Sequence, residues 1–213
     1  MKTDDLIAVL SRQAEAVDPH TPIRRLLLAS LIGVAAALPL MLWHLGINPG
    51  LAGDAQTPMF WIKWGFVVLV VGASAVLVAR LARPGVDVRR AVQAVAAPVV
   101  ALWALAAAVL FAAAPDERMP LVMGSSWSSC PLNIALLSLP ALVLLLSAVR
   151  TLAPTRLRMA GAATGLLAGA LGTLAYLLHC PELEAPFLAI WYVIGMATPA
   201  VIGAVIGPRV LRW

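Results

Sequence analysis

Six long apolar runs divide the chain, and each is long enough to cross a lipid bilayer as an α-helix. A membrane-spanning helix needs about 20 mostly apolar residues. The polar stretches between the runs are too short to form a separate soluble domain. The pattern therefore predicts an all-α integral membrane bundle in residues 25–213, preceded by a polar N-terminal segment, residues 1–24. The expected transmembrane helices cover residues 25–45, 60–81, 92–114, 131–149, 157–178 and 187–207.

The composition agrees with a membrane protein. Hydrophobic residues make up 62% of the 213 residues and charged residues 12%, with a mean hydropathy of +0.95. A soluble domain has about 45–50% apolar and about 25% charged residues. The first 20 residues include Asp4, Asp5, Glu15 and Asp18, whereas a secretory signal peptide opens with a basic region. We therefore expect the first apolar run to stay in the protein as a membrane anchor.

Basic residues are concentrated in alternate connections between the runs. Thirteen of the fifteen Lys and Arg residues fall in the N-terminal segment, the second and fourth connections and the C-terminus; the other side has only Lys63 and Arg118. Cytoplasmic connections of membrane proteins collect Lys and Arg. This distribution predicts that both termini are cytoplasmic. It also explains the net charge of +5 as a topology signal, so we expect no direct binding of nucleic acid.

Several kinds of chemistry are not supported by the sequence. The middle of the predicted helices contains no Asp, Glu, Lys, Arg or His, although such residues mark proton relays and ion paths. There is no glycine-rich phosphate loop and no evident catalytic constellation, so we do not expect an enzyme. A small transporter or permease subunit is an alternative, but it requires a polar path that we do not find. A structural membrane protein with a periplasmic disulfide is a second alternative.

The two cysteines are the strongest candidates for chemistry. Cys130 lies in GSSWSSCPLNI (124–134) and Cys180 in LLHCPELEAPF (177–187). The predicted topology places both on the extracytoplasmic side, which is oxidising in bacteria. They could form a structural disulfide, which requires Cα atoms within about 7 Å. They could instead be a reactive or metal-sensing pair with His179 as a third candidate ligand, or two unrelated small residues. The residues alone leave all three interpretations open.

Glycines recur every four residues in two of the predicted helices, at Gly161, Gly165 and Gly169 and again at Gly203 and Gly207. Small residues at this interval let helices approach closely in lipid. We favour packing within one chain, and a homodimer through these glycine faces is the alternative.

The N-terminal segment has the pattern of a short amphipathic helix. Asp4 and Asp5 suit the positive end of the helix dipole, and Leu6, Ile7 and Leu10 fall on one face. Such a helix could lie on its own bilayer or loops, or in a groove of a cytoplasmic partner. The acidic residues disfavour an anionic membrane surface, so we favour a protein partner.

The whole chain resembles the NrsF-type membrane anti-sigma factors of proteobacteria. The similarity is most specific in the start MKTDDLIAVLS and in the segments GSSWSSCP and LLHCPE. The resemblance implies a regulator in the bacterial inner membrane that binds an extracytoplasmic-function sigma factor. It further implies sensing of heavy metals or oxidative stress through Cys130 and Cys180, with no permanent cofactor and at most a transient heavy-metal ion. The sigma-binding residues it implies are Asp4, Asp5, Leu6, Ile7 and Leu10.

Overall fold

The computed structural model describes residues 20–83 and 85–212, and the helices in this part of the chain are joined by loops without any β-strand. Six helical segments are long and apolar enough to cross a membrane. The predicted all-α fold with six membrane-spanning helices is confirmed. The helices are α2 (Thr21–His44), α3 (Leu51–Asp54), α4 (Pro58–Leu81), α5 (Arg89–Ala112), α6 (Arg118–Met123), α7 (Cys130–Arg150), α8 (Leu157–Tyr176), α9 (Ala185–Phe187), the π-helical turn η1 (Leu188–Tyr192) and α10 (Val193–Val210).

Four of the long helical segments have proline in the first turn, and three of these prolines lie at the same end of the bundle. Pro58 opens α4, Pro131 follows the first residue of α7, and Pro186 lies in α9. Proline suits this position because its fixed φ matches a helix and its missing N–H would have had no partner there. At α4, Thr57 Oγ1 also accepts a hydrogen bond from the Phe60 N–H at 3.4 Å. These residues fix where the three segments start.

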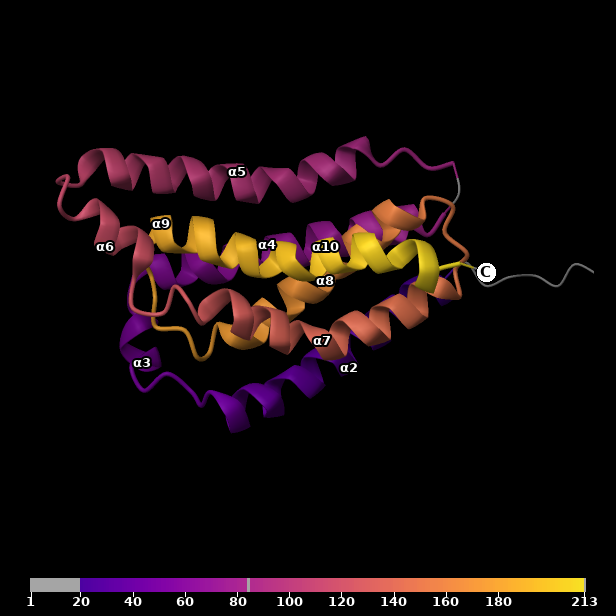
Figure 1. The fold of residues 1–213 in the computed structure, drawn as a ribbon, viewed down its shortest axis with the longest axis horizontal. Coiled ribbons are helices and arrows are strands. Elements are labelled where there is room, and N and C mark those ends of the chain that lie inside the picture. The colour runs from indigo at the N-terminus through magenta and orange to yellow at the C-terminus, as the bar shows by residue number, and fades with distance from the viewer. Residues whose placement is uncertain (1–19, 84, 213) are drawn as a thin grey trace, which may run out of the picture.

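Helix α8 lies at the centre of the bundle and packs against α10, α7, α4 and α2. Its glycines allow this. A Cβ atom at Gly161 would collide with the Gly203 carbonyl of α10, and one at Gly165 would collide with the Pro199 carbonyl. The glycine faces are therefore occupied inside one chain. Helix α5 packs mainly on α4, α9 and η1, and Figure 1 shows it at the edge of the bundle.

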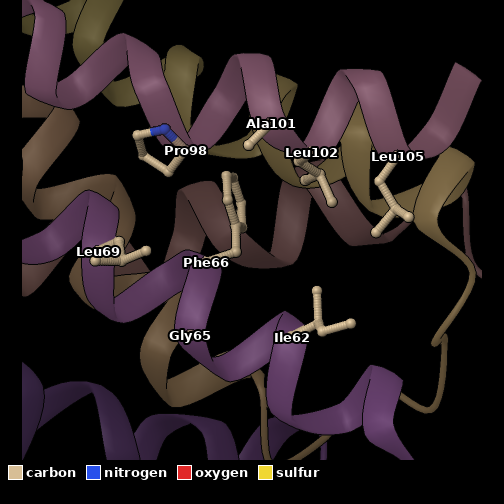
Figure 2. A pocket seen from close by; sticks show the side chains of 8 residues that line it. All are labelled: Ile62, Gly65, Phe66, Leu69, Pro98, Ala101, Leu102 and Leu105. Atoms are coloured by element: carbon tan, nitrogen blue, oxygen red, sulfur yellow. The ribbon is translucent and has the colours of Figure 1, made fainter.

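The outer surface of the bundle is apolar, with large side chains such as Leu31, Phe111 and Val143 exposed. Such a surface is unusual for a soluble monomer and suits contact with lipid. A crevice of about 330 Å³ opens between α4 and α5, and Figure 2 shows only hydrocarbon side chains around it, among them Phe66 and Leu102. The crevice therefore offers no polar chemistry.

The two ends of the bundle differ in their side chains. We call one end the thiol end: it contains Cys130, Cys180, α3, α6 and the loop 177–184, at the left of Figure 1. We call the opposite end the arginine end. Its arginines, among the described residues, are Arg24, Arg25, Arg80, Arg83, Arg89, Arg90, Arg150, Arg156, Arg158, Arg209 and Arg212.

Candidate functional site at the thiol end

The fold brings the two cysteines together. Cys130 is the first residue of α7, and Cys180 lies in the loop that follows α8. Their exposed fractions are 0% and 2%, and they belong to the same hydrophobic cluster. Both are free thiols, and their side chains are close enough for a hydrogen bond between them. Residues 50 positions apart in the sequence thus form one buried thiol pair.

A buried lysine lies beside this pair. Lys63, in the second turn of α4, has an exposed fraction of 1%. Its Nζ atom donates hydrogen bonds to the carbonyl oxygens of Cys180 at 2.7 Å and Glu182 at 3.0 Å. The shorter distance is typical of a hydrogen bond from a charged donor. The ammonium group also lies 5.5 Å from the centre of the Tyr192 ring, within range of a cation–π contact. Lys63 thereby connects α4 to the loop that contains Cys180.

The surroundings of Cys180 favour its ionised form. A hydrogen bond from the Cys130 side chain stabilises the thiolate, the positive charge of Lys63 adds to this, and burial opposes both. Together they lower the pKa of Cys180 to about 6. Because the thiolate is the nucleophilic and metal-binding form of cysteine, Cys180 is the more reactive candidate of the pair at neutral pH.

Glu182 joins the two cysteine segments. Its Oε1 atom accepts hydrogen bonds from the Ser125 N–H at 2.7 Å, the Ser125 hydroxyl at 2.6 Å and the Ser126 hydroxyl at 3.4 Å. Gly124 adopts a φ of +54°, and a Cβ atom there would lie 2.7 Å from Glu182 Oε2. The segment before Cys130 therefore requires glycine at position 124. Its serines hold the loop after Cys180 in place through hydrogen bonds to Glu182.

Aromatic side chains from the start of the last membrane helix close the site. Tyr192 is fully buried at the end of the π-helical turn, and its hydroxyl lies beside the Cys180 thiol. Its ring centre lies 6.1 Å from that of Tyr176. The neighbouring Trp191 donates its indole N–H to the Val122 carbonyl at 2.9 Å. These contacts hold the turn against the thiol pair and against α6.

His179 is turned to a different partner. Its Nδ1 atom lies 3.1 Å from the Gly46 carbonyl oxygen, and its ring packs 5.5 Å from that of Tyr176. In residues 20–83 and 85–212, no three His, Cys, Asp or Glu side chains form a group that could hold a metal ion. Of the three candidate ligands, the structure thus brings together Cys130 and Cys180.

Sequence reasoning missed Lys63 as a part of this site. Lys63 counts in the sequence only as one of two basic residues on the extracytoplasmic side. The signal that could have identified it is its place inside an apolar run, between Trp61 and Trp64, because an ionisable residue within a membrane helix needs a buried partner.

The predicted sigma-binding residues, Asp4, Asp5, Leu6, Ile7 and Leu10, lie outside the described residues. The structure therefore adds nothing to that prediction.

Fold and site together define a helical multi-pass membrane protein with a buried thiol pair at one end. Residues 10–213 match the family NrsF, negative regulator of sigma F, and the chain belongs to this family. It is 46% identical to the probable anti-sigma-F factor NrsF of Azospira oryzae over 213 residues, which is the whole of both chains. It is 40% identical to the anti-sigma-F factor NrsF of Caulobacter vibrioides over 215 residues, again over both full lengths. No solved structure matches the chain. The resemblance predicted from the sequence is confirmed.

Proposed function

We propose that this protein is an anti-sigma factor of the bacterial inner membrane that binds an extracytoplasmic-function sigma factor on its cytoplasmic side. In this proposal the sigma factor is released when Cys130 and Cys180 react with a heavy-metal ion or an oxidant. Membership of the NrsF family supports the regulatory role. The observation that carries the sensing role is the buried contact of the two thiols, with Lys63 beside them.

The distribution of charge supports the orientation. The arginine end faces the cytoplasm in this proposal, because arginine and lysine collect in cytoplasmic connections. Helix α2 starts at this end with Thr21, so the first membrane helix would begin on the cytoplasmic side. The sigma factor would bind there, and the thiols would react on the opposite side.

The chemistry of the sensing step follows from the pair. An oxidant removes two electrons, the S–S bond forms, and the two thiols lose two protons in total. A metal ion would instead bind the two sulfurs as thiolates and displace their protons. Either product joins the start of α7 to the loop after α8. A signal shifts a conformational equilibrium only through different affinities for its two states, and a linked pair supplies such a difference.

The first test concerns the sigma factor. The full-length protein, tagged at its C-terminus and expressed in its host, is purified in mild detergent, and co-purifying proteins are identified by mass spectrometry. We expect a sigma factor, and we expect Leu6→Asp and Leu10→Asp to abolish its recovery. Ser11→Asp is the matched control, since it adds the same charge to the same segment beside the apolar positions. Absence of any sigma factor from the wild-type preparation would overturn the proposal.

The second test concerns the thiols. A transcriptional reporter driven by the released sigma factor is measured before and after exposure to a heavy-metal ion or to the thiol oxidant diamide. We expect the Cys130→Ser, Cys180→Ser double variant to lose the induced response. Ser128→Ala, at an exposed position next to the site, is expected to respond as the wild type does. Normal induction in the double variant would refute the sensing role.

A further inference from the structure

Lys63 is the only buried charged side chain among the described residues. Burying a charge is costly unless hydrogen bonds compensate for the lost water. Here the compensation comes from the backbone of one short loop, through the carbonyl oxygens of Cys180 and Glu182. A costly group that is satisfied by two carbonyls of the same loop points to a role for Lys63 in shaping that loop.

We propose that Lys63 is a positioning residue of the thiol pair, which holds the backbone on both sides of Pro181 so that Cys180 faces Cys130. This inference rests on the function proposed above for the two thiols. It assigns to Lys63 a task that is separate from topology and separate from binding of the sigma factor.

The geometry of the loop supports this assignment. The Cys180 N–H donates to the Tyr176 carbonyl at 3.1 Å, which fixes the start of the loop to the end of α8. The Glu182 carboxylate is engaged by the 124–129 segment. Between these two anchors, the ammonium group of Lys63 contacts the carbonyls immediately before and after Pro181. Because the backbone sets the direction of the Cα–Cβ bond, fixing both carbonyls limits the Cys180 sulfur to the few positions that its staggered rotamers allow.

The position of Lys63 in its helix also allows it to hold the loop. Lys63 extends from α4, which packs on α8 and α5 and does not supply either thiol. Its ammonium group lies over the Tyr192 ring. Lys63 thereby fixes the loop to a third helix, α4, in addition to α7 and α8. Without Lys63, the proline-containing loop would keep its two outer anchors and lose the inner one.

The test is the redox equilibrium of the thiol pair in the purified full-length protein. The protein is equilibrated with reduced and oxidised glutathione at pH 7, quenched with acid, denatured and labelled with a thiol reagent, so that burial does not affect the count. In the exchange, two molecules of reduced glutathione convert the disulfide to two thiols and become one molecule of oxidised glutathione. The equilibrium constant measures how well the two cysteines are held together.

We expect Lys63→Met, which keeps the length and removes the donors, to disfavour the disulfide by about tenfold, which is a potential about 30 mV higher. Lys63→Arg, which retains charge and donors, should stay within about threefold of the wild type. Lys63→Gln is uncharged like methionine but keeps two donors on a shorter side chain, and it should lie in between. Ile62→Ala is the matched control on the neighbouring, lipid-facing position and should leave the constant unchanged.

Several outcomes would overturn the proposal. A merely structural lysine would lower the thermal unfolding midpoint when replaced by methionine but leave the equilibrium constant of the folded protein unchanged. A lysine acting only through its charge would make the disulfide more favourable when removed, because a stabilised thiolate would be lost. If Lys63→Met cannot be purified as a monodisperse protein, an unchanged constant in Lys63→Gln is the refuting result. The measurement involves no sigma factor, so it fails or succeeds independently of the anti-sigma role.

Discussion

The two ends of the bundle are built on different principles. At the thiol end, hydrogen bonds join segments that are far apart in the sequence: the Asn48 N–H binds the Leu178 carbonyl at 3.0 Å, and Lys63 and Glu182 each connect two elements. At the arginine end, Arg25 donates to the Thr151 hydroxyl at 2.9 Å and Arg80 to the Asp87 carbonyl at 3.2 Å, both at exposed positions. One end is a closed site, whereas the other presents its charges outward.

This difference indicates how one fold can serve two tasks. A buried and cross-connected end can hold two thiols in a fixed relation, as the sensing chemistry that we propose requires. An end with outward-facing arginines remains accessible to lipid headgroups or to a protein. The helices that connect the ends are therefore as important as either end, and the comparison can be tested by perturbing the connection first and then each end.

The largest effect is expected from Gly165→Val in α8, because it should disrupt the helix packing that connects the two ends of the bundle. Its side chain would collide with the Pro199 carbonyl and come within 2.8 Å of the Ala200 Cα atom. Overpacking of this kind costs about 3 kcal/mol at the upper end of the usual range. We expect a lower thermal unfolding midpoint in detergent and loss of monodisperse protein. Gly72→Ala in α4, where a Cβ meets nothing within 4 Å, is the control and should be neutral or slightly stabilising.

A smaller effect, confined to the thiol end, is expected from Glu182→Ala. The substitution removes the acceptor of the Ser125 N–H and hydroxyl. Since these groups are partly reached by water, we expect a loss of about 1 kcal/mol in the free energy of unfolding. Denaturant titration in detergent measures it, with Glu184→Ala, an acidic residue at an exposed position, as control. Equal losses in both variants would argue against a specific contact between the two cysteine segments.

The pH dependence of Cys180 reactivity also tests the thiol end. Its pKa is lowered, so the thiolate is present above about pH 6 and is lost as the pH falls through that value. Cys130→Ala removes the first cause of the lowering and should shift the midpoint upward. Because the pKa starts at about 6, an upward shift of one unit lowers the thiolate fraction at pH 7 only from about nine-tenths to about one-half, so the midpoint of the profile is the more sensitive readout.

This shift is measured as the rate at which Cys180 reacts with methyl methanethiosulfonate between pH 5 and 9, quantified by peptide mass spectrometry. The profile of wild-type Cys180 is the reference. Identical midpoints in the two proteins would show that the Cys130 thiol does not stabilise the Cys180 thiolate.

The smallest effect is expected at the arginine end, from Arg25→Gln. The hydrogen bond to the Thr151 hydroxyl is exposed, and water can replace it on both sides. Exposed substitutions of this kind usually change stability by less than about 0.5 kcal/mol. A loss above about 1 kcal/mol in the free energy of unfolding, measured by the same denaturant titration, would mean that the arginine end is as tightly connected as the thiol end. The two ends would then not differ in the way described.

The sequence predicted the helices well because the requirement for them is local. About 20 consecutive apolar residues are sufficient to specify a membrane span, and the six predicted runs match the positions of the long helices to within a few residues. The two cysteines were also evident, since they are the only thiols and each precedes a proline. Both features can be seen without knowing which helices are neighbours.

The contents of the site could not be predicted in the same way. Lys63 and Cys180 are 117 residues apart, and only the packing of α4 beside α8 brings the lysine to the loop. The same applies to Glu182 and Ser125, which are 57 residues apart. A hydrophobic pattern says which faces are apolar but not which faces meet, and membrane helices give a weak pattern because lipid and protein are both apolar.

The π-helical turn Leu188–Tyr192 gives the chain between the thiol loop and the last membrane helix one residue of slack. Such a turn contains one residue more than an α-helix would in the same span, and it takes up that residue without changing the direction of the helix on either side. A one-residue deletion within the turn would therefore restore a regular helix and leave the loop that contains Cys180 on the same side of it. The same deletion in the regular part of α10 would rotate the loop by about 100° relative to the rest of that helix. Natural variation in chain length should therefore be tolerated in the turn and not in α10.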